Sequence, residues 1–149
     1  MFSCKTTLNC LLIIAAFGAN GVRAADPDVC AALPIATVNE LVHQNLVGTR
    51  ADVSQAAHSF GCAYGKDGLV SVSVIRPGGA AAFARTIGRY SNAMTVPGLG
   101  DRALHDMAFG TIALFGDVAF DASVPRGTMS DAQELAIEKS LILALRNKL

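Results

Sequence analysis

Cysteines and histidines are the side chains of this chain best suited to nucleophilic, acid–base or metal chemistry. The 149 residues include four Cys and three His. Cys62 lies in the segment HSFGCAYGKDG, four residues after His58, and Cys30 lies in DVCAAL. A thiolate nucleophile needs a basic neighbour that lowers its pKa. A spacing of four would place His58 beside Cys62 on a helix, but this segment has the pattern of a strand. We therefore expect Cys62 to serve the architecture.

The first 24 residues have the three parts of a secretory signal peptide. Lys5 gives a weak positive start, residues 10–18 (CLLIIAAFG) form an apolar core, and Val22 and Ala24 are small residues at a cleavage site. That core is shorter than the roughly 20 residues that span a bilayer. We expect cleavage after Ala24, leaving one domain over residues 25–149 in the periplasm or outside the cell. A retained N-terminal anchor is the alternative.

Cleavage would leave Cys30 and Cys62 as the cysteines of the mature chain. Two cysteines in an exported chain usually form a disulfide. A bridge of this loop size stabilises a fold by about 3–4 kcal/mol in the chain-entropy model. We expect it to tie the first hairpin strand to the N-terminal helical segment. A metal pair and a reactive thiol are the alternatives.

The mature chain would carry a net charge of −2, because Lys5 and Arg23 are the only charged residues of the expected signal peptide. It has no basic stripe, so we predict no nucleic-acid partner. We expect an unknown protein or small ligand of the cell envelope, with no stable membrane span after cleavage. The candidates for contact with an anionic ligand or acidic partner are Arg76, Arg85, Arg89 and Arg102. Dispersed surface arginines are the alternative.

If the protein is a small enzyme, His58, His105 and Asp106 are its candidate acid–base groups. His105 and Asp106 are neighbours on an expected strand, so they point to opposite faces and cannot form one dyad. The three scattered histidines give a weak metal pattern, and no G-x-S-x-G motif is present. We therefore predict no catalytic residue, no metal site and no cofactor. Solvated surfaces are expected for the acidic residues Glu40, Glu134, Glu138, Asp117 and Asp121.

The stretch GLGDRA at residues 98–103 matches G-x-G-x-x-A. A dinucleotide site needs a buried strand before this motif and a helix that opens within it. Here Pro97 precedes the motif and β-prone residues follow it. We expect a turn that needs glycine dihedrals, in which Asp101 binds local amides.

Hydrophobic periodicity predicts three helices. The first opens at the capping box Thr37-x-x-Glu40 and ends near Gly48, the second covers residues 80–90, and the third opens at the capping box Ser130-x-x-Gln133. A helical turn around Cys30 precedes them.

Apolar alternation and turn residues predict five strands, at residues 60–64, 69–75, 103–109, 111–115 and 118–124. Residues 50–58 are polar and receive no assignment, and residues 91–101 are expected to form a loop. The order is α-β-β-α-β-β-β-α. It predicts an α+β fold, with a mainly antiparallel sheet of about five strands packed with three helices.

The expected mature chain resembles a family of small secreted, often lipid-anchored actinobacterial proteins of unknown function. The matching segments are DVCAAL at residue 28, GCAY at 61, VSVSVI at 70, GLGDRA at 98 and the hairpin around Gly116. The resemblance supports the disulfide, because Cys30 and Cys62 match the family's cysteine positions. It implies an α-β-α sandwich of the photosystem-II extrinsic-protein type, with envelope association and no catalytic residues. The chain lacks the family's lipid-attachment cysteine, which fits a soluble exported form.

These observations favour an exported, non-catalytic binding or accessory module with one disulfide. A small periplasmic enzyme that uses His58 or His105 is one alternative, and a structural, oligomer-forming subunit is the other. Loss of an activity on alanine substitution at these histidines would favour the enzyme.

Overall fold

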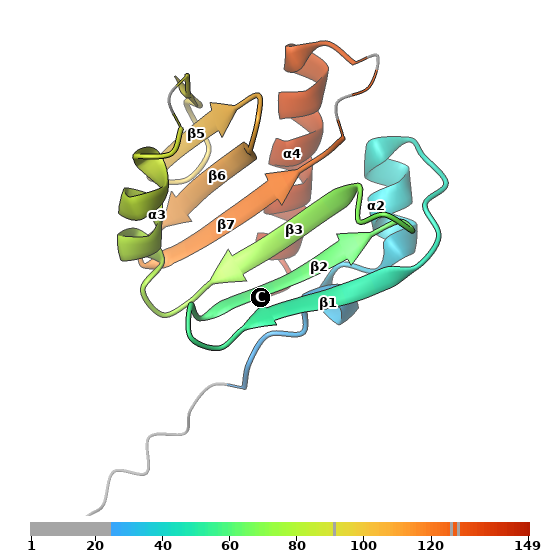
Figure 1. The fold of residues 1–149 in the computed structure, drawn as a ribbon, viewed down its shortest axis with the longest axis horizontal. Coiled ribbons are helices and arrows are strands. Elements are labelled where there is room, and N and C mark those ends of the chain that lie inside the picture. The colour runs from blue at the N-terminus through green and yellow to red at the C-terminus, as the bar shows by residue number, and fades with distance from the viewer. Residues whose placement is uncertain (1–24, 91, 126, 128) are drawn as a thin grey trace, which may run out of the picture.

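The residues that the structure describes form a single antiparallel sheet of seven strands with four helices (Figure 1). The computed structural model describes residues 25–90, 92–125, 127 and 129–149. The α+β class and the antiparallel sheet are confirmed, with two strands and one helix more than predicted. The expected signal peptide, residues 1–24, lies outside the described residues. No helix in the described part of the chain is long and apolar enough to cross a membrane.

The strands are β1 Thr49–Ser54, β2 Ser59–Tyr64, β3 Val70–Ile75, β4 Met94–Thr95, β5 Arg102–Asp106, β6 Gly110–Phe115 and β7 Val118–Ser123. The helices are α1 Val29–Ala32, α2 Ile35–Val42, α3 Gly79–Ile87 and α4 Asp131–Arg146.

Two three-stranded meanders build most of the sheet. The spatial order is β1-β2-β3-β7-β6-β5-β4, so the meander β1–β3 and the meander β5–β7 meet along their last strands. Val74 on β3 lies opposite Phe120 on β7 at this junction. The two halves of the sheet are therefore joined by a single strand pair.

Helices cover the two faces of the sheet unequally. Alternation on β3 sends Val70, Val72 and Val74 into the main core, which also contains residues of α1, α2 and α4. On the opposite face Phe83 of α3 packs with Ile112 and the other members of a smaller cluster. Helix α3 covers the β6–β7 part of that face, and Figure 1 shows no helix in front of β1 and β2.

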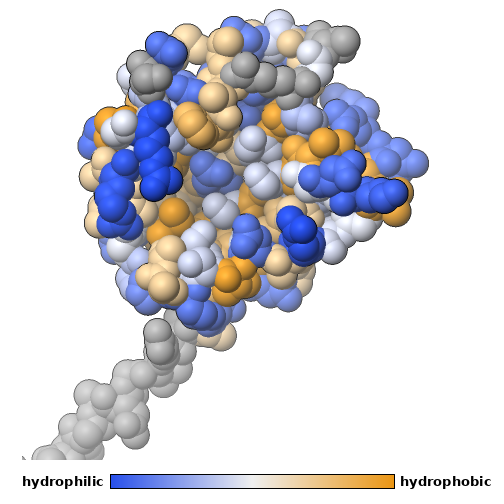
Figure 2. Space-filling view, in the orientation of Figure 1, coloured by the Kyte–Doolittle hydropathy of each residue, from blue (hydrophilic) through white to orange (hydrophobic). Residues whose placement is uncertain are grey.

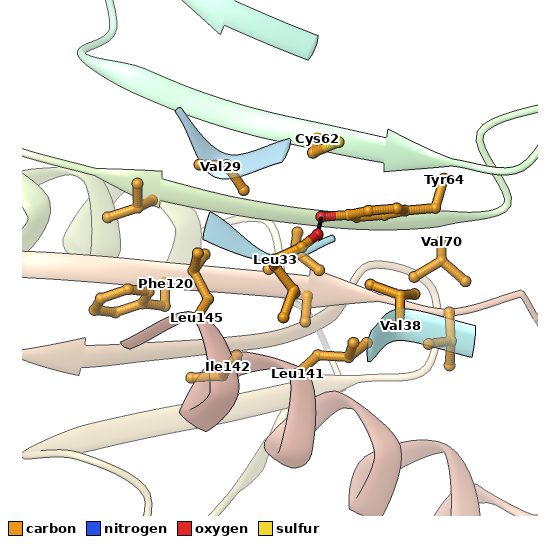
Figure 3. Packing of buried hydrophobic residues seen from close by; sticks show 14 of the residues in the cluster. Val29, Leu33, Val38, Cys62, Tyr64, Val70, Phe120, Leu141, Ile142 and Leu145 are labelled. Atoms are coloured by element: carbon orange, nitrogen blue, oxygen red, sulfur yellow. Dashed lines mark hydrogen bonds between the residues drawn. The ribbon is translucent and has the colours of Figure 1, made fainter. Parts of the chain in front are cut away.

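The main core closes around Tyr64 and the C-terminal half of α4 (Figure 3). Leu141, Ile142 and Leu145 are fully buried against the sheet. The Tyr64 hydroxyl donates a hydrogen bond of 2.6 Å to the carbonyl oxygen of Leu33. Burial, with the nearby charge of Asp28, raises the pKa of Tyr64 to about 12. This phenol therefore stays protonated and fixes the end of α1 to β2.

The predicted disulfide joins Cys30 of α1 to Cys62 of β2, with a Cα–Cα distance of 5.1 Å. Its position confirms that the N-terminal helical turn is tied to the first hairpin. Cys62 is buried in the main core, so its sulfur serves the architecture.

The helix boundaries confirm one capping box and correct the other. Ser130 and Gln133 form the predicted reciprocal box at the start of α4. Helix α2 instead begins at Ile35, directly after Pro34, which places Thr37 inside the helix. It ends at Val42, well before Gly48, because His43 adopts a left-handed conformation. The Asn39 side chain then bonds the backbone of Leu46 in both directions and closes the following loop.

The GLGD segment is a turn leading into β5, with no helix after it. Gly98 and Gly100 both have positive φ, and a Cβ at Gly100 would overlap the Leu114 carbonyl. The Asp101 carboxylate accepts from the distant Gly116 N–H at 2.6 Å, where a local amide was predicted. This geometry explains the glycines without a dinucleotide.

Candidate functional site

A buried polar cluster lies between the β5–β6 hairpin and α4. On β5, alternation turns Ala103 into the main core and His105 to the same face. Thr111 of β6 is the register partner of His105. Glu138 projects from α4 onto this pair, and all three side chains have no exposed surface.

Hydrogen bonds in the cluster determine the state of the imidazole. The Thr111 hydroxyl donates its proton to Glu138 Oε2 at 2.6 Å. Nδ1 of His105 lies 3.0 Å from both Thr111 Oγ1 and Glu138 Oε2. When Glu138 is ionised and the hydroxyl proton is used in this way, both oxygens near Nδ1 are acceptors, so Nδ1 carries the hydrogen that it shares with them. Nε2 has no partner among the described residues, although it is buried.

Glu138 is the hydrogen-bonding centre of the cluster. Burial raises the pKa of its carboxyl above the ordinary range, and the bond from Thr111 and the charge of His105 oppose that rise. Its second oxygen accepts the Val124 N–H at 3.3 Å. The carboxylate thereby links α4 to the ends of β5, β6 and β7.

Glu134 lies one helical turn before Glu138 and is also buried, with 5% of its surface exposed. No hydrogen bond to its carboxylate forms within the described part of the chain. One ligating atom each of His105, Glu134 and Glu138 lies within 4.8 Å of the others. The prediction that Glu134 and Glu138 lie on a solvated surface is therefore wrong, because α4 turns both toward the sheet.

A hollow of about 300 Å³ lies beside this cluster and includes His105 in its lining. Met94, Asp106 and Asp131 also line it. Asp106 is on the other face of β5, where its carboxylate accepts the Ala108 N–H at 2.7 Å. As predicted, His105 and Asp106 do not form a dyad.

The second candidate site is the uncovered face of the β1–β2–β3–β7 half of the sheet, hereafter the open sheet face. The register places Asp52, Gly61, Ser73 and Asp121 in one row across these strands. They line a shallow hollow of about 170 Å³ together with Ser59, Ala63 and Ser71. Figure 2 shows this face in the orientation of Figure 1, with apolar and polar surface intermixed.

Asp121 is the ionisable group at the inner end of this row. Burial, with a smaller contribution from the negative charge of Glu138, raises the pKa of Asp121 to about 7. Its carboxyl forms no hydrogen bond to the residues that the structure describes. Asp121 is half-buried and lies on the central strand β7, so the prediction that it lies beside a sheet edge is wrong.

The other sequence-predicted acid–base group, His58, lies apart from the buried cluster. It precedes β2 with a positive φ and borders a hollow of about 420 Å³ with Asp26, Arg76 and Asp117. Asp117 instead caps the start of α3, because its carboxylate accepts the N–H groups of Gly78 and Ala80. Those two bonds lower the pKa of Asp117.

The four candidate arginines are distributed around α3. Arg102 lies over the Phe83 ring, 5.1 Å from its centroid. Arg85 is exposed on α3 and Arg89 follows that helix, whereas Arg76 borders the hollow that contains His58. That these arginines bind an anion or an acidic partner stays a prediction.

Sequence reasoning missed Thr111, Glu138 and Asp121. A signal for the glutamates was present, because Glu134, Glu138, Leu141 and Leu145 are spaced by four, three and four residues, which is the period of one helix face. For Thr111 and Asp121, single positions in apolar strands gave no sign of which face they occupy.

Comparisons with known proteins gave no match to a family model, to a curated protein or to a solved structure.

Proposed function

We propose that the protein is an exported, disulfide-stabilised binding module that recognises a ligand or partner of the cell envelope through the open sheet face. The Cys30–Cys62 bridge supports an oxidising compartment, since disulfides are rare in the cytosol. The resemblance to small secreted actinobacterial proteins is part of the same proposal, and helices on both faces of the sheet support it.

The unpartnered polar row on the open sheet face carries this proposal. A sheet face that a helix covers is normally apolar, as in the cluster under α3. The open half instead carries small hydroxyl side chains and two carboxyls, those of Asp52 and Asp121. Such groups provide hydrogen-bonding capacity without a bulky side chain that would block a flat approach.

The binding role is favoured over catalysis by the burial of His105. An acid–base group must come within hydrogen-bond reach of its substrate. His105 has no exposed surface, and its oriented ring lies beneath α4. The open sheet face, by contrast, is accessible without any rearrangement.

The test is capture from an envelope extract of the source organism by the exported, oxidised protein. Ser73→Arg would fill the centre of the open sheet face with a long charged side chain. Ser140→Arg is the matched control, because Ser140 is exposed on α4. We expect the set of specifically captured molecules, quantified by mass spectrometry, to fall at least tenfold with Ser73→Arg and to be retained with Ser140→Arg.

Equal capture by the two arginine variants would exclude the open sheet face as the binding surface. Thermal unfolding of both variants shows whether the fold is intact. A stable Ser73→Arg protein with undiminished capture is the outcome that contradicts the proposal.

A further inference from the structure

We propose that His105 and Glu134 bind a divalent transition-metal cation, with Glu138 as the positioning residue that orients the imidazole. This site is separate from the open sheet face and lies on the other side of the sheet. The inference starts from a buried ring nitrogen that has no hydrogen-bond partner among the described residues and from a carboxylate close to the same ring.

The first of these groups is Nε2 of His105. A buried ring nitrogen without a hydrogen bond loses its solvation and gains nothing in return. Because Nδ1 carries the proton shared with Thr111 and Glu138, a neutral ring presents a free lone pair at Nε2. A lone pair of this kind accepts either a proton or a metal ion.

The second group is the carboxylate of Glu134, a residue with 5% of its surface exposed, and it lies close to the same ring. With Glu138 it places two carboxylates beside one imidazole in the protein interior. Burying uncompensated negative charge is costly. A divalent cation would neutralise the two carboxylates together. An imidazolium carries only one positive charge and could neutralise only one of them.

Glu138 has the arrangement expected of an orienting carboxylate. Metal-bound histidines usually donate their other ring N–H to a carboxylate, which fixes the tautomer and the ring direction. Here the Nδ1–Oε2 distance is 3.0 Å, and the Thr111 hydroxyl holds the same oxygen at 2.6 Å. The orientation is therefore set before any ion binds.

The distances suit an ion of the zinc class. Zinc binds imidazole nitrogen and carboxylate oxygen at about 2.0–2.2 Å, which separates tetrahedral ligands by about 3.3 Å. One ring nitrogen of His105 and one carboxylate oxygen each of Glu134 and Glu138 lie within 4.8 Å of one another, so Glu134 is within reach of the imidazole. A rotamer change of the flexible Glu134 side chain can close the remaining distance. Water from the hollow of about 300 Å³ that His105 lines can fill the other coordination positions.

The cysteines within residues 25–149 give no competing site, because Cys30 and Cys62 are joined in the disulfide. The exposed histidine His43 and the half-buried His58 are the other imidazoles of the chain. They lie on separate segments and define the controls of the test.

The test is a Zn²⁺ titration, by isothermal calorimetry, of the protein purified without a histidine tag after export in an expression host and stripped with a chelator. We expect one ion per chain and at least tenfold weaker binding by Glu134→Gln. Glu40→Gln, a matched change of an exposed glutamate on α2, should leave the affinity unchanged. The double variant His43→Ala, His58→Ala should also bind normally.

Nitrogen-15 NMR of the histidine rings supplies an independent measurement that needs no substitution. Zn²⁺ should shift the Nε2 resonance of His105 to the metal-bound range, while Nδ1 keeps its proton. Absence of saturable binding, equal affinity of a folded Glu134→Gln variant, or an unchanged His105 spectrum would each overturn the proposal. Failure of the capture experiment with Ser73→Arg would leave the metal proposal unaffected, since the metal site and the open sheet face share no residue.

Discussion

Asp121 shows how one side chain can couple the open sheet face to pH. Its position on the central strand β7 raises its pKa to about 7, chiefly through burial. The carboxyl of an unfolded chain titrates near pH 3.8. Between these values the folded protein holds a proton that the unfolded chain has lost.

The sign of the resulting effect is a loss of stability as the pH rises. The contribution of Asp121 is fully present below about pH 4 and is lost as the pH reaches about 7. Asp121→Asn should remove this pH dependence. Between about pH 4 and about pH 7, the free energy of unfolding of the variant should therefore rise by about 1–2 kcal/mol relative to that of the wild type. This magnitude allows for the partial contact of the carboxyl with water. Urea unfolding at several pH values measures the difference, and parallel curves for the two proteins would contradict the assignment.

At the scale of elements, the start of α4 positions the whole buried cluster. Ser130 accepts from the Gln133 N–H, and the Gln133 side chain accepts from the Ser130 N–H at 2.9 Å. Glu134 and Glu138 follow within the next two turns. The capping box therefore fixes the helix register that brings both glutamates under the sheet.

Ser130→Ala should lower the free energy of unfolding by about 1 kcal/mol, because it removes the side-chain acceptor of the cap. Ser140→Ala is the matched control in the helix interior, where alanine is the better helix former. Chemical denaturation should show a loss for the first change and none for the second. Equal stabilities would show that the cap contributes nothing measurable.

The sequence predicts those helices and strands that bury one side and expose the other. The alternation on β3 and the box at Ser130 were interpreted correctly. Strand β1 was missed because all six of its residues are exposed, so TRADVS has no apolar period. Helix α2 starts two residues before the predicted capping position Thr37, because Pro34 already sets the backbone for a helix start at Ile35. The His105–Glu138 contact joins residues 33 apart, which no local pattern encodes.

At the scale of the whole molecule, the disulfide joins the first helix to the sheet. It links residues separated by 32 positions, so its loss frees a sizeable loop in the unfolded chain. The double variant Cys30→Ala, Cys62→Ala should lower the free energy of unfolding by about 3–4 kcal/mol. Reductant should destabilise the wild type and leave the double variant unaffected. A wild-type melting curve that does not respond to reduction would contradict the structural role of the bridge.

The order of elements along the chain has a consequence for biosynthesis. Helix α1, the first meander and both bridging cysteines all lie within residues 29–75. Every partner that the sulfurs need is therefore synthesised before β5, β6, β7 and α4 exist. Oxidation can therefore close the bridge before the second half of the fold has formed, and β3 then presents a free strand edge with which β7 pairs to complete the sheet.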